Sequence, residues 1–311
     1  MAPSSLLSLA RPGADLTDRI GHTPLVPVGG LAGVPESVTV LGKAEWLNPG
    51  GSVKDRAAWG IVRAAEAAGA LDRGRTLLDA TSGNTGIAYA WIGAVRGFRV
   101  TLCLPANANA ERKRLLAALG ADLVLTDAMD GTDGAIREAR RLAEAHPDRY
   151  YYADQYANPA NWRAHYHGTA KEIWIETTGR VTHLVAGIGT SGTLVGTARR
   201  LRELAPGFTA VAVQPDSPLH ALEGLKHLPS AIVPPIYDPS VHARTIEVAS
   251  EEAIAMVKRQ ARRGLLLGWS AGAALAAVER LARGLSHAVV VAILPDGAER
   301  YLSEPSWGGD A

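Results

Sequence analysis

The stretch TLLDATSGNTG, residues 76–86, decides the fold that we expect for this chain. Its first part, 76–80, is rich in apolar residues and predicts a buried strand. The segment 81–86, rich in glycine and hydroxyl side chains, follows directly and leads into a helical pattern from about Thr85. A strand, a glycine-rich turn and a helix in this order are typical of α/β proteins, in which ligands bind beyond the carboxyl ends of parallel strands.

The same order recurs in HLVAGIGTSGT, residues 183–193. Free backbone N–H groups at the start of a helix attract anions, and glycines let a ligand approach the backbone closely. Two such loops therefore suggest two bound anions. The alternative is that each loop is only a tight turn between a strand and a helix, but the many Ser, Thr and Asn residues in both loops favour anion sites.

Short β-rich runs alternate with longer helical patterns along the rest of the chain. Continuous apolar strands separated by helices predict parallel sheets covered by helices on both faces. The strands are too many for one small sheet, so we expect two three-layer α/β domains. Strands are predicted at 37–45, 76–80, 98–105, 121–127, 183–189, 209–215 and 287–295, and helices at about 52–70, from 85, 110–120, 135–145, 159–177, from 191, 251–263 and 270–284.

The composition of the 311 residues is that of an ordinary globular protein, with 47% hydrophobic and 20% charged residues. The net charge of +1 gives no reason to expect nucleic acid or a membrane surface as a partner. No run approaches the roughly 20 apolar residues of a membrane span, and the first residues lack the pattern of a signal peptide, so we expect a cytoplasmic protein. The single cysteine, Cys103, and the scattered histidines predict neither a disulfide within the chain nor a metal site.

The stretch NPGGSVKDR, residues 48–56, places a lysine where a helix is expected to begin. Ser52 as N-cap and Asp55 three residues later form an S-x-x-D capping pattern, which would put Lys54 at the second helical position. The helix dipole disfavours a cation there, which would lower the pKa of Lys54 and expose a nucleophilic amine. The alternative is a solvated surface lysine. Together with two anion sites, a reactive amine indicates pyridoxal phosphate chemistry on an amino acid.

The second glycine loop also fits the dinucleotide fingerprint G-x-G-x-x-G, with Asp216 lying 24 residues after Gly192. A nicotinamide cofactor is therefore an alternative, but it leaves NPGGSVKDR unexplained. The hydroxyl groups in the loop better suit a terminal phosphate monoester, whose extra oxygens need more donors. The glycines are Gly187, Gly189 and Gly192, and the hydroxyl residues are Thr190, Ser191 and Thr193.

Five motifs in this order resemble those of the cysteine synthase and cystathionine β-synthase group of fold-type II pyridoxal phosphate enzymes, over about residues 17–303. The resemblance implies two α/β domains of the tryptophan synthase β type and a homodimer. It implies a smaller, movable domain at 43–150 that binds the substrate carboxylate, and a larger domain, 1–42 with 151–311, that binds the cofactor phosphate. The motifs are GHTPLV (21–26), NPGGSVKDR (48–56), TSGNTG (81–86), GIGTSGT (187–193) and GWSAGAA (268–274).

The resemblance also implies roles for individual residues. Lys54 is expected to form the Schiff base, and Asn84 to contact the 3′-oxygen of the cofactor. Ser270 is expected to hydrogen-bond the pyridine nitrogen. The substrate carboxylate would be surrounded by Thr81, Ser82, Asn84, Thr85 and Gln155, and the phosphate loop would comprise Gly187, Gly189, Thr190, Ser191, Gly192 and Thr193.

Ser270 precedes a helical pattern, so an alternative or additional role is that of an N-cap. A hydroxyl partner, unlike a carboxylate, would leave the pyridine nitrogen largely unprotonated. A weaker electron sink of this kind suits β-elimination better than transamination.

The stretches 154–166, 171–174 and 224–229 look most like the cysteine synthase B and O-phosphoserine sulfhydrylase branch. In that branch a basic residue occupies the position of Lys226, where a cation would favour a phosphate leaving group or an anionic sulfur donor such as thiosulfate. The alternative is an exposed loop lysine. The sequence departs from the usual pattern at Trp269 and in LPDGAERYL, residues 294–302, which leaves the donor and the acceptor open.

The expected reaction is a β-replacement on an O-activated L-serine, O-acetylserine or O-phosphoserine. A sulfur nucleophile, sulfide or thiosulfate, would add to an α-aminoacrylate intermediate and give L-cysteine or S-sulfocysteine. The alternatives are a cystathionine β-synthase-like condensation with homocysteine, a serine/threonine dehydratase, a nicotinamide-dependent oxidoreductase, and a non-catalytic relative.

Overall fold

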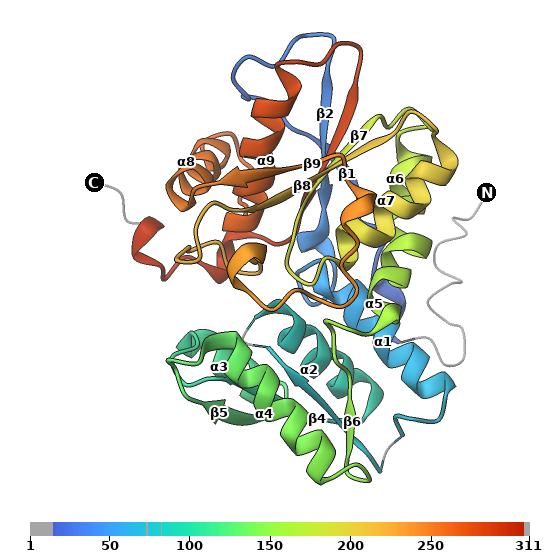
Figure 1. Cartoon of the computed structure of the whole chain (residues 1–311), viewed down its shortest axis with the longest axis vertical. Coiled ribbons are helices and arrows are strands. Elements are labelled where there is room, and N and C mark those ends of the chain that lie inside the picture. The colour runs from blue at the N-terminus through green and yellow to red at the C-terminus, as the bar shows by residue number, and fades with distance from the viewer. Residues whose placement is uncertain (1–14, 73, 82, 308–311) are drawn as a thin grey trace, which may run out of the picture.

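The computed structural model describes residues 15–72, 74–81 and 83–307. Two sheets organise the fold, and Figure 1 shows them in two units, with the four-stranded sheet below the six-stranded one. All strand pairs except β1 (Leu25–Pro27) with β2 (Thr39–Ala44) are parallel. The predicted α/β class with mostly parallel sheets is therefore confirmed.

The four-stranded sheet has the order β5-β4-β3-β6 and is covered on both faces. On one face, Leu102 and its neighbours pack with apolar residues of three helices, and on the other Cys103 packs with Ile136 of a fourth helix, because side chains alternate along a strand. The strands are β3 (Thr76–Ala80), β4 (Arg99–Pro105), β5 (Asp122–Thr126) and β6 (Tyr150–Tyr152), and the helices are α1 (Lys54–Ala67), α2 (Asn84–Arg96), α3 (Ala110–Ala118) and α4 (Gly131–Ala145).

The six-stranded sheet has the order β1-β2-β10-β7-β8-β9. Leu184 faces a core formed with α6 and α7, while the next residue, Val185, faces the core formed with α8 and α9. The further strands are β7 (His183–Gly187), β8 (Thr209–Pro215), β9 (Arg244–Val248) and β10 (Val289–Leu294), and the helices are α5 (Pro159–Ala164), α6 (Ala170–Glu176), α7 (Gly192–Leu204), α8 (Ser250–Ala261) and α9 (Trp269–Ala282).

The helix predicted at 159–177 consists of α5, a π-helical turn at His165–Thr169, and α6. The turn is fixed by a contact of 2.9 Å between Nδ1 of His165 and Oγ1 of Thr169. Short 3₁₀ helices lie at Leu16–Arg19, Glu45–Leu47, Leu228–Ser230, Pro239–Val241, Ala298–Arg300 and Pro305–Trp307. Within the described part of the chain, none of the helices has the length and apolar character needed to cross a membrane.

Three strands were not predicted, and all three lie at sheet edges: β1, β6 and β9. Strands β1 and β6 have three residues each, which is too short for a recognisable alternation of apolar residues. Most residues of β9 are exposed, so its sequence RTIEV lacks the apolar run of a central strand.

Candidate active site

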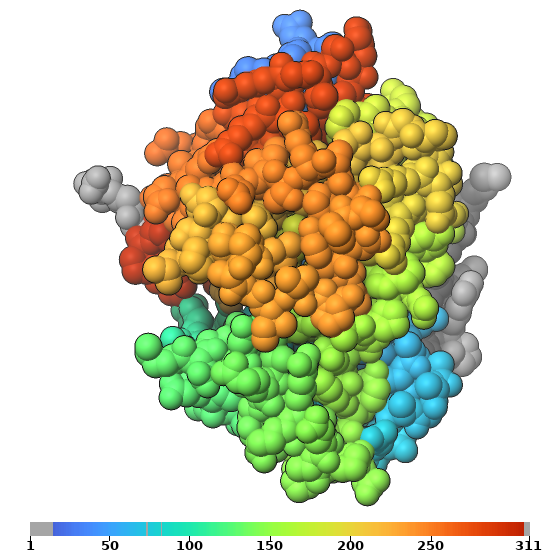
Figure 2. Space-filling model, in the orientation of Figure 1, coloured from blue at the N-terminus to red at the C-terminus, as the bar shows by residue number. Residues whose placement is uncertain are grey.

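Two adjoining cavities lie where the carboxyl ends of strands from both sheets meet. The larger has a volume of about 150 Å³ and is lined mainly from the four-stranded unit and from residues 223–226. The smaller, of about 30 Å³, is lined by the loop after β7 and by the start of α9. Lys54 and Asn84 line both cavities. Figure 2 shows the later part of the chain, in orange, lying against the green surface of the four-stranded unit on the face shown.

Lys54 is the first residue of α1, and Val53 is its N-cap. The predicted capping box of Ser52 and Asp55 is therefore wrong. The carboxylate of Asp55 instead accepts a hydrogen bond of 2.5 Å from the N–H of Gly50, and Oγ of Ser52 accepts one of 3.3 Å from the N–H of Lys54. The side chain of Asp55 thus holds the loop that leads into the helix.

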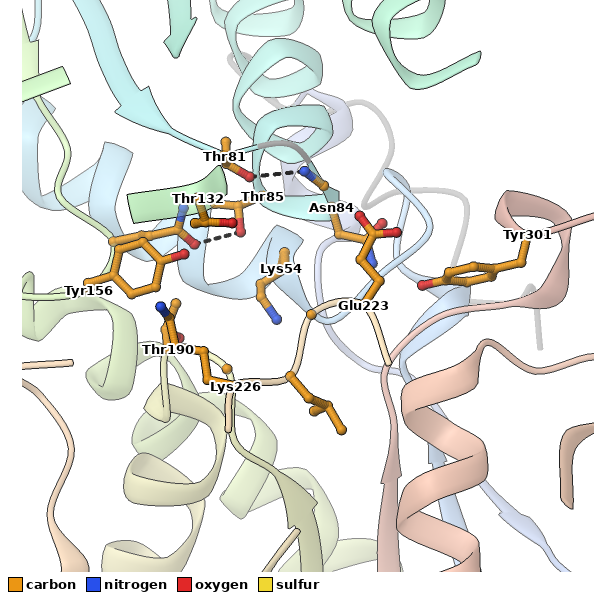
Figure 3. Close-up of a pocket in the computed structure, with 15 residues that line it drawn as sticks. Lys54, Thr81, Asn84, Thr85, Thr132, Tyr156, Thr190, Glu223, Lys226 and Tyr301 are labelled. Atoms are coloured by element: carbon orange, nitrogen blue, oxygen red, sulfur yellow. Dashed lines mark hydrogen bonds between the residues drawn. The ribbon is translucent and has the colours of Figure 1, made fainter. Parts of the chain in front are cut away.

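The environment of Lys54 disfavours its charged form. Burial lowers the pKa of the Lys54 amine, and the negative charge of Asp296 partly opposes this shift. An amine with a lowered pKa is a better nucleophile and base at neutral pH. Figure 3 shows Lys54 near the centre of the labelled residues, with Thr190 on one side and Asn84 on the other. The prediction of a reactive lysine thus agrees with its position at both cavities.

The loop 187–193 leaves no room for side chains at two of its glycines. A Cβ carbon at Gly189 would lie 2.1 Å from the backbone oxygen of Gly224, and one at Gly192 would lie 2.0 Å from Oδ1 of Asn161. Ser191, the N-cap of α7, has φ of 71°, and its Oγ is buried without a hydrogen-bond partner. Of the predicted phosphate loop, the smaller cavity is lined by Gly187, Gly189, Thr190, Ser191 and Thr193.

Ser270 lines the smaller cavity together with this loop and is 5% exposed. It is the second residue of α9, whose N-cap is Gly268, so the proposed N-cap role of Ser270 is wrong. The Ser270 hydroxyl is therefore not used as the helix cap and is available to a molecule bound in the cavity.

A contiguous set of polar side chains lines the larger cavity (Figure 3). Oγ1 of Thr85 donates a hydrogen bond of 2.7 Å to Oε1 of Gln155, and Nε2 of Gln155 donates one of 3.1 Å to the backbone oxygen of Ala80. The structure thus brings together four of the five residues predicted to surround a carboxylate, and the fifth, Ser82, lies outside the described residues. The four are Thr81, Asn84, Thr85 and Gln155.

Lys226 also lines the larger cavity. Its backbone N–H donates a hydrogen bond of 2.7 Å to the oxygen of Ile188, which places it next to the phosphate loop. Its Nζ lies 3.8 Å from Oδ1 of Asp133 and 5.1 Å from the ring centroid of Tyr156. Burial lowers the pKa of the Lys226 amine, and Asp133 opposes this shift. Lys226 is therefore a partly buried cation at the cavity rather than an exposed loop lysine.

Several residues of the site were missed from the sequence. Thr132 comes from a segment without a distinctive motif, and Tyr156 lies in the stretch 154–166, which was compared with the family only as a whole. Glu223, which also lines the cavity, pairs with Arg112 of α3. Tyr301 belongs to the stretch 294–302, whose departure from the usual pattern was a signal that it contributes to the site. Among residues 15–72, 74–81 and 83–307, no group of three or more His, Cys, Asp or Glu side chains has the arrangement of a metal site.

These residues fit a cofactor that carries a phosphate group and reacts with an amine. The lysine amine is partly desolvated, a buried hydroxyl of the helix-start loop has no partner, and glycines form the walls around it. A phosphate oxygen would accept from the Ser191 hydroxyl and from free N–H groups at the start of α7.

Comparisons with known proteins agree with this fit. The sequence matches the family described as "Pyridoxal-phosphate dependent enzyme" over residues 16–296. A cysteine synthase of Aquifex aeolicus is 47% identical over 291 residues, 91% of this chain and 89% of that protein. A cysteine synthase B of Pseudomonas aeruginosa is 43% identical over 289 residues, 93% of this chain and 95% of that protein. A crystal structure of cysteine synthase (OASS) from Entamoeba histolytica has a TM-score of 0.91 and 34% identity, and covers 97% of this chain and 93% of that chain.

The predictions of a fold-type II fold and of pyridoxal phosphate as cofactor are thereby confirmed. The nicotinamide alternative, which rested on the G-x-G-x-x-G pattern alone, is not retained. The chain belongs to the pyridoxal phosphate-dependent enzyme family and, within it, to the cysteine synthases.

Proposed function

We propose that the chain catalyses a β-replacement on an O-activated L-serine, in which a sulfur nucleophile displaces the β-substituent to give L-cysteine or S-sulfocysteine. The observation that carries this proposal is the position of Lys54. Its amine lies where the cavity of the phosphate loop meets the cavity of the polar residues around Gln155. An amino acid held by its carboxylate in the larger cavity would thus lie beside both the lysine and the cofactor.

Pyridoxal phosphate, when bound, supplies an electron sink that stabilises negative charge on the α-carbon of an amino acid. Lys54 would hold the cofactor covalently. Its Nζ, once free, would take the proton from the α-carbon and return it after the sulfur nucleophile has added. Because burial lowers the pKa of Lys54, the free amine is better able to accept this proton at neutral pH.

Substrate binding depends on the start of α2. Thr85 lies in its first turn, and the hydrogen bond with Gln155 fixes the orientation of both side chains. A substrate carboxylate would accept hydrogen bonds here and gain from the helix dipole. We propose 43–150 as the smaller, movable domain and 1–42 with 151–311 as the larger one. Closure over the carboxylate would exclude water from the reacting carbon.

Lys226 would face the β-substituent from the opposite side of the cavity. A partly buried cation stabilises a phosphate leaving group or an anionic sulfur donor more than a neutral acetyl group. We therefore propose O-phosphoserine and thiosulfate as substrates beside O-acetylserine and sulfide.

A substrate matrix tests this function. The purified protein is offered O-acetylserine, O-phosphoserine and serine, each with sulfide, thiosulfate or homocysteine, and the products are separated by mass. Cysteine or S-sulfocysteine supports the proposal. A keto acid with ammonia would indicate a dehydratase, and cystathionine would indicate condensation with homocysteine. A homodimer and a cytoplasmic location are also proposed, supported by the resemblance and the composition, and sedimentation and fractionation test them.

A further inference from the structure

Residues of the segment 296–301 form hydrogen bonds with both the nitrogen and the oxygen of the Asn84 side-chain amide. Nδ2 of Asn84 donates a hydrogen bond of 2.7 Å to Oδ2 of Asp296, and Oδ1 accepts one from Nη1 of Arg300. These partners lie 212 and 216 residues further along the chain. An amide whose nitrogen and oxygen are both engaged by distinct groups has one preferred orientation.

Arg300 also holds the loop that carries Lys54. Its Nη2 donates a hydrogen bond to the backbone oxygen of Gly50. The N–H of Val53 donates one of 2.8 Å to the oxygen of Pro295, and Ser52 forms a β-bridge with Asp296. One guanidinium group therefore connects Asn84 at the start of α2 with the loop before α1.

The side chain of Asp296 is also held in place by Tyr301 and Gly268. Its Oδ2 accepts a further hydrogen bond of 2.6 Å from the hydroxyl of Tyr301, and the residue is 1% exposed. A Cβ carbon at Gly268 would lie 2.1 Å from Oδ1 of Asp296, so the glycine makes room for the carboxylate. Tyr301 points its hydroxyl toward the side of the cavity where Asn84 lies (Figure 3).

We infer that Asp296 and Arg300 are positioning residues. They orient the Asn84 amide and hold it at a fixed position relative to the loop that carries Lys54. The amide nitrogen has two hydrogens, and the one that Asp296 does not accept would be available to hydrogen-bond a cofactor in the cavity that Asn84 lines. This inference rests on the proposed function only in assigning Asn84 to the cofactor. It adds that the orientation of Asn84 is set by the segment 296–301.

A double-mutant cycle tests the inference, with the absorbance band of the bound cofactor and its dissociation constant as readouts. The variants are Arg300→Met, Arg300→Lys, Asn84→Ala and the combination of Asn84→Ala with Arg300→Met. Arg283→Met is the matched control, since Arg283 pairs with Glu279 on α9, outside both cavities. Interacting residues show non-additive effects in such a cycle.

We expect Arg300→Met to weaken cofactor binding by about tenfold and to shift the absorbance band in the same direction as Asn84→Ala. In the Asn84→Ala background, Arg300→Met should add little. Arg300→Lys, which keeps the charge but reaches one acceptor instead of two, should fall in between. If Arg300→Met does not fold, Arg300→Lys alone and combined with Asn84→Ala completes the cycle.

Additive effects of the two substitutions, or a band that is unchanged in both Arg300 variants, would overturn the inference. Arg283→Met should leave band and affinity unchanged. Both readouts use the cofactor alone, without an amino-acid substrate. An absence of cysteine synthesis in the wild type would therefore count against the proposed function and leave the cycle interpretable.

Discussion

The backbone of Gly189 packs against the backbone carbonyl of Gly224, so that a Cβ carbon at residue 189 would lie 2.1 Å from the Gly224 oxygen. Gly189 belongs to the loop proposed to bind the cofactor phosphate. Gly224 lies between Glu223 and Lys226 in the chain and lines the larger cavity with them. The contact therefore joins the cofactor loop to the segment that we propose for substrate selection.

Gly189→Ala is expected to weaken pyridoxal phosphate binding. A carbonyl oxygen of the main chain cannot rotate away as a side chain can, so the loop must move, at a cost of about 1–3 kcal/mol. Equilibrium dialysis of the cofactor measures the change. Gly207→Ala is the control, because a Cβ carbon there meets nothing within 4 Å. Equal affinities of the two variants would show that the loop does not contact the cofactor.

Ser270→Asp is expected to retain the cofactor but to slow turnover. A carboxylate near the start of α9 is compatible with the helix dipole, so folding should persist. It would favour a protonated pyridine nitrogen and thereby change the electron sink on which β-elimination depends. Cofactor content and kcat are measured together. Full occupancy with an unchanged kcat would refute the role of Ser270 at the nitrogen.

Lys226→Met is expected to raise KM for O-phosphoserine by about tenfold, the equivalent of one lost charge-assisted hydrogen bond, and to change KM for O-acetylserine little. Asp133→Asn should lower KM for O-phosphoserine, because it removes the carboxylate that lies 3.8 Å from the Lys226 amine. Lys171→Met, at an exposed position on α6, is the control. If Lys226→Met left the O-phosphoserine kinetics intact, the anion pocket would be excluded.

Asp55→Asn is expected to reduce the pH dependence of stability. Burial raises the pKa of Asp55 from 3.8 to about 7. Between these values the folded state holds more protons than the unfolded chain, so the free energy of unfolding falls as pH rises from about 4 to about 7. The variant should therefore gain stability at pH 8, by on the order of 4 kcal/mol as an upper limit.

Urea unfolding at pH 5 and pH 8 measures this difference. Because burial also raises the pKa of Asp79 to about 7, the variant should keep part of the pH dependence. A slope between pH 5 and 8 identical to that of the wild type would contradict the account of Asp55.

The central strands and their glycine loops were predictable because burial on both faces imposes apolar runs, as in β3. The cavity-lining residues on those two loops, such as Thr81 and Thr193, were expected from the same pattern and from the resemblance. The edge strand β9 was missed, since its exposed residues follow no apolar pattern.

The capping roles of Ser52 and Ser270 were mispredicted, because local sequence does not reveal which backbone turn precedes a helix. In the structure the side chain of Asp55 binds the Gly50 N–H, and Gly268 caps α9. The contacts of Asn84 with Asp296 and Arg300 span more than 200 residues. No local pattern contains such a contact, so only the folded structure discloses it.

The most direct test of the account is to locate the lysine that binds the cofactor. The purified protein is loaded with pyridoxal phosphate, reduced with borohydride and digested, and the modified peptide is sequenced by mass spectrometry. One modified lysine, Lys54, is expected, and no modification is expected in Lys54→Ala. A label on Lys226, which lines the same cavity, or no label on the wild type, would contradict it.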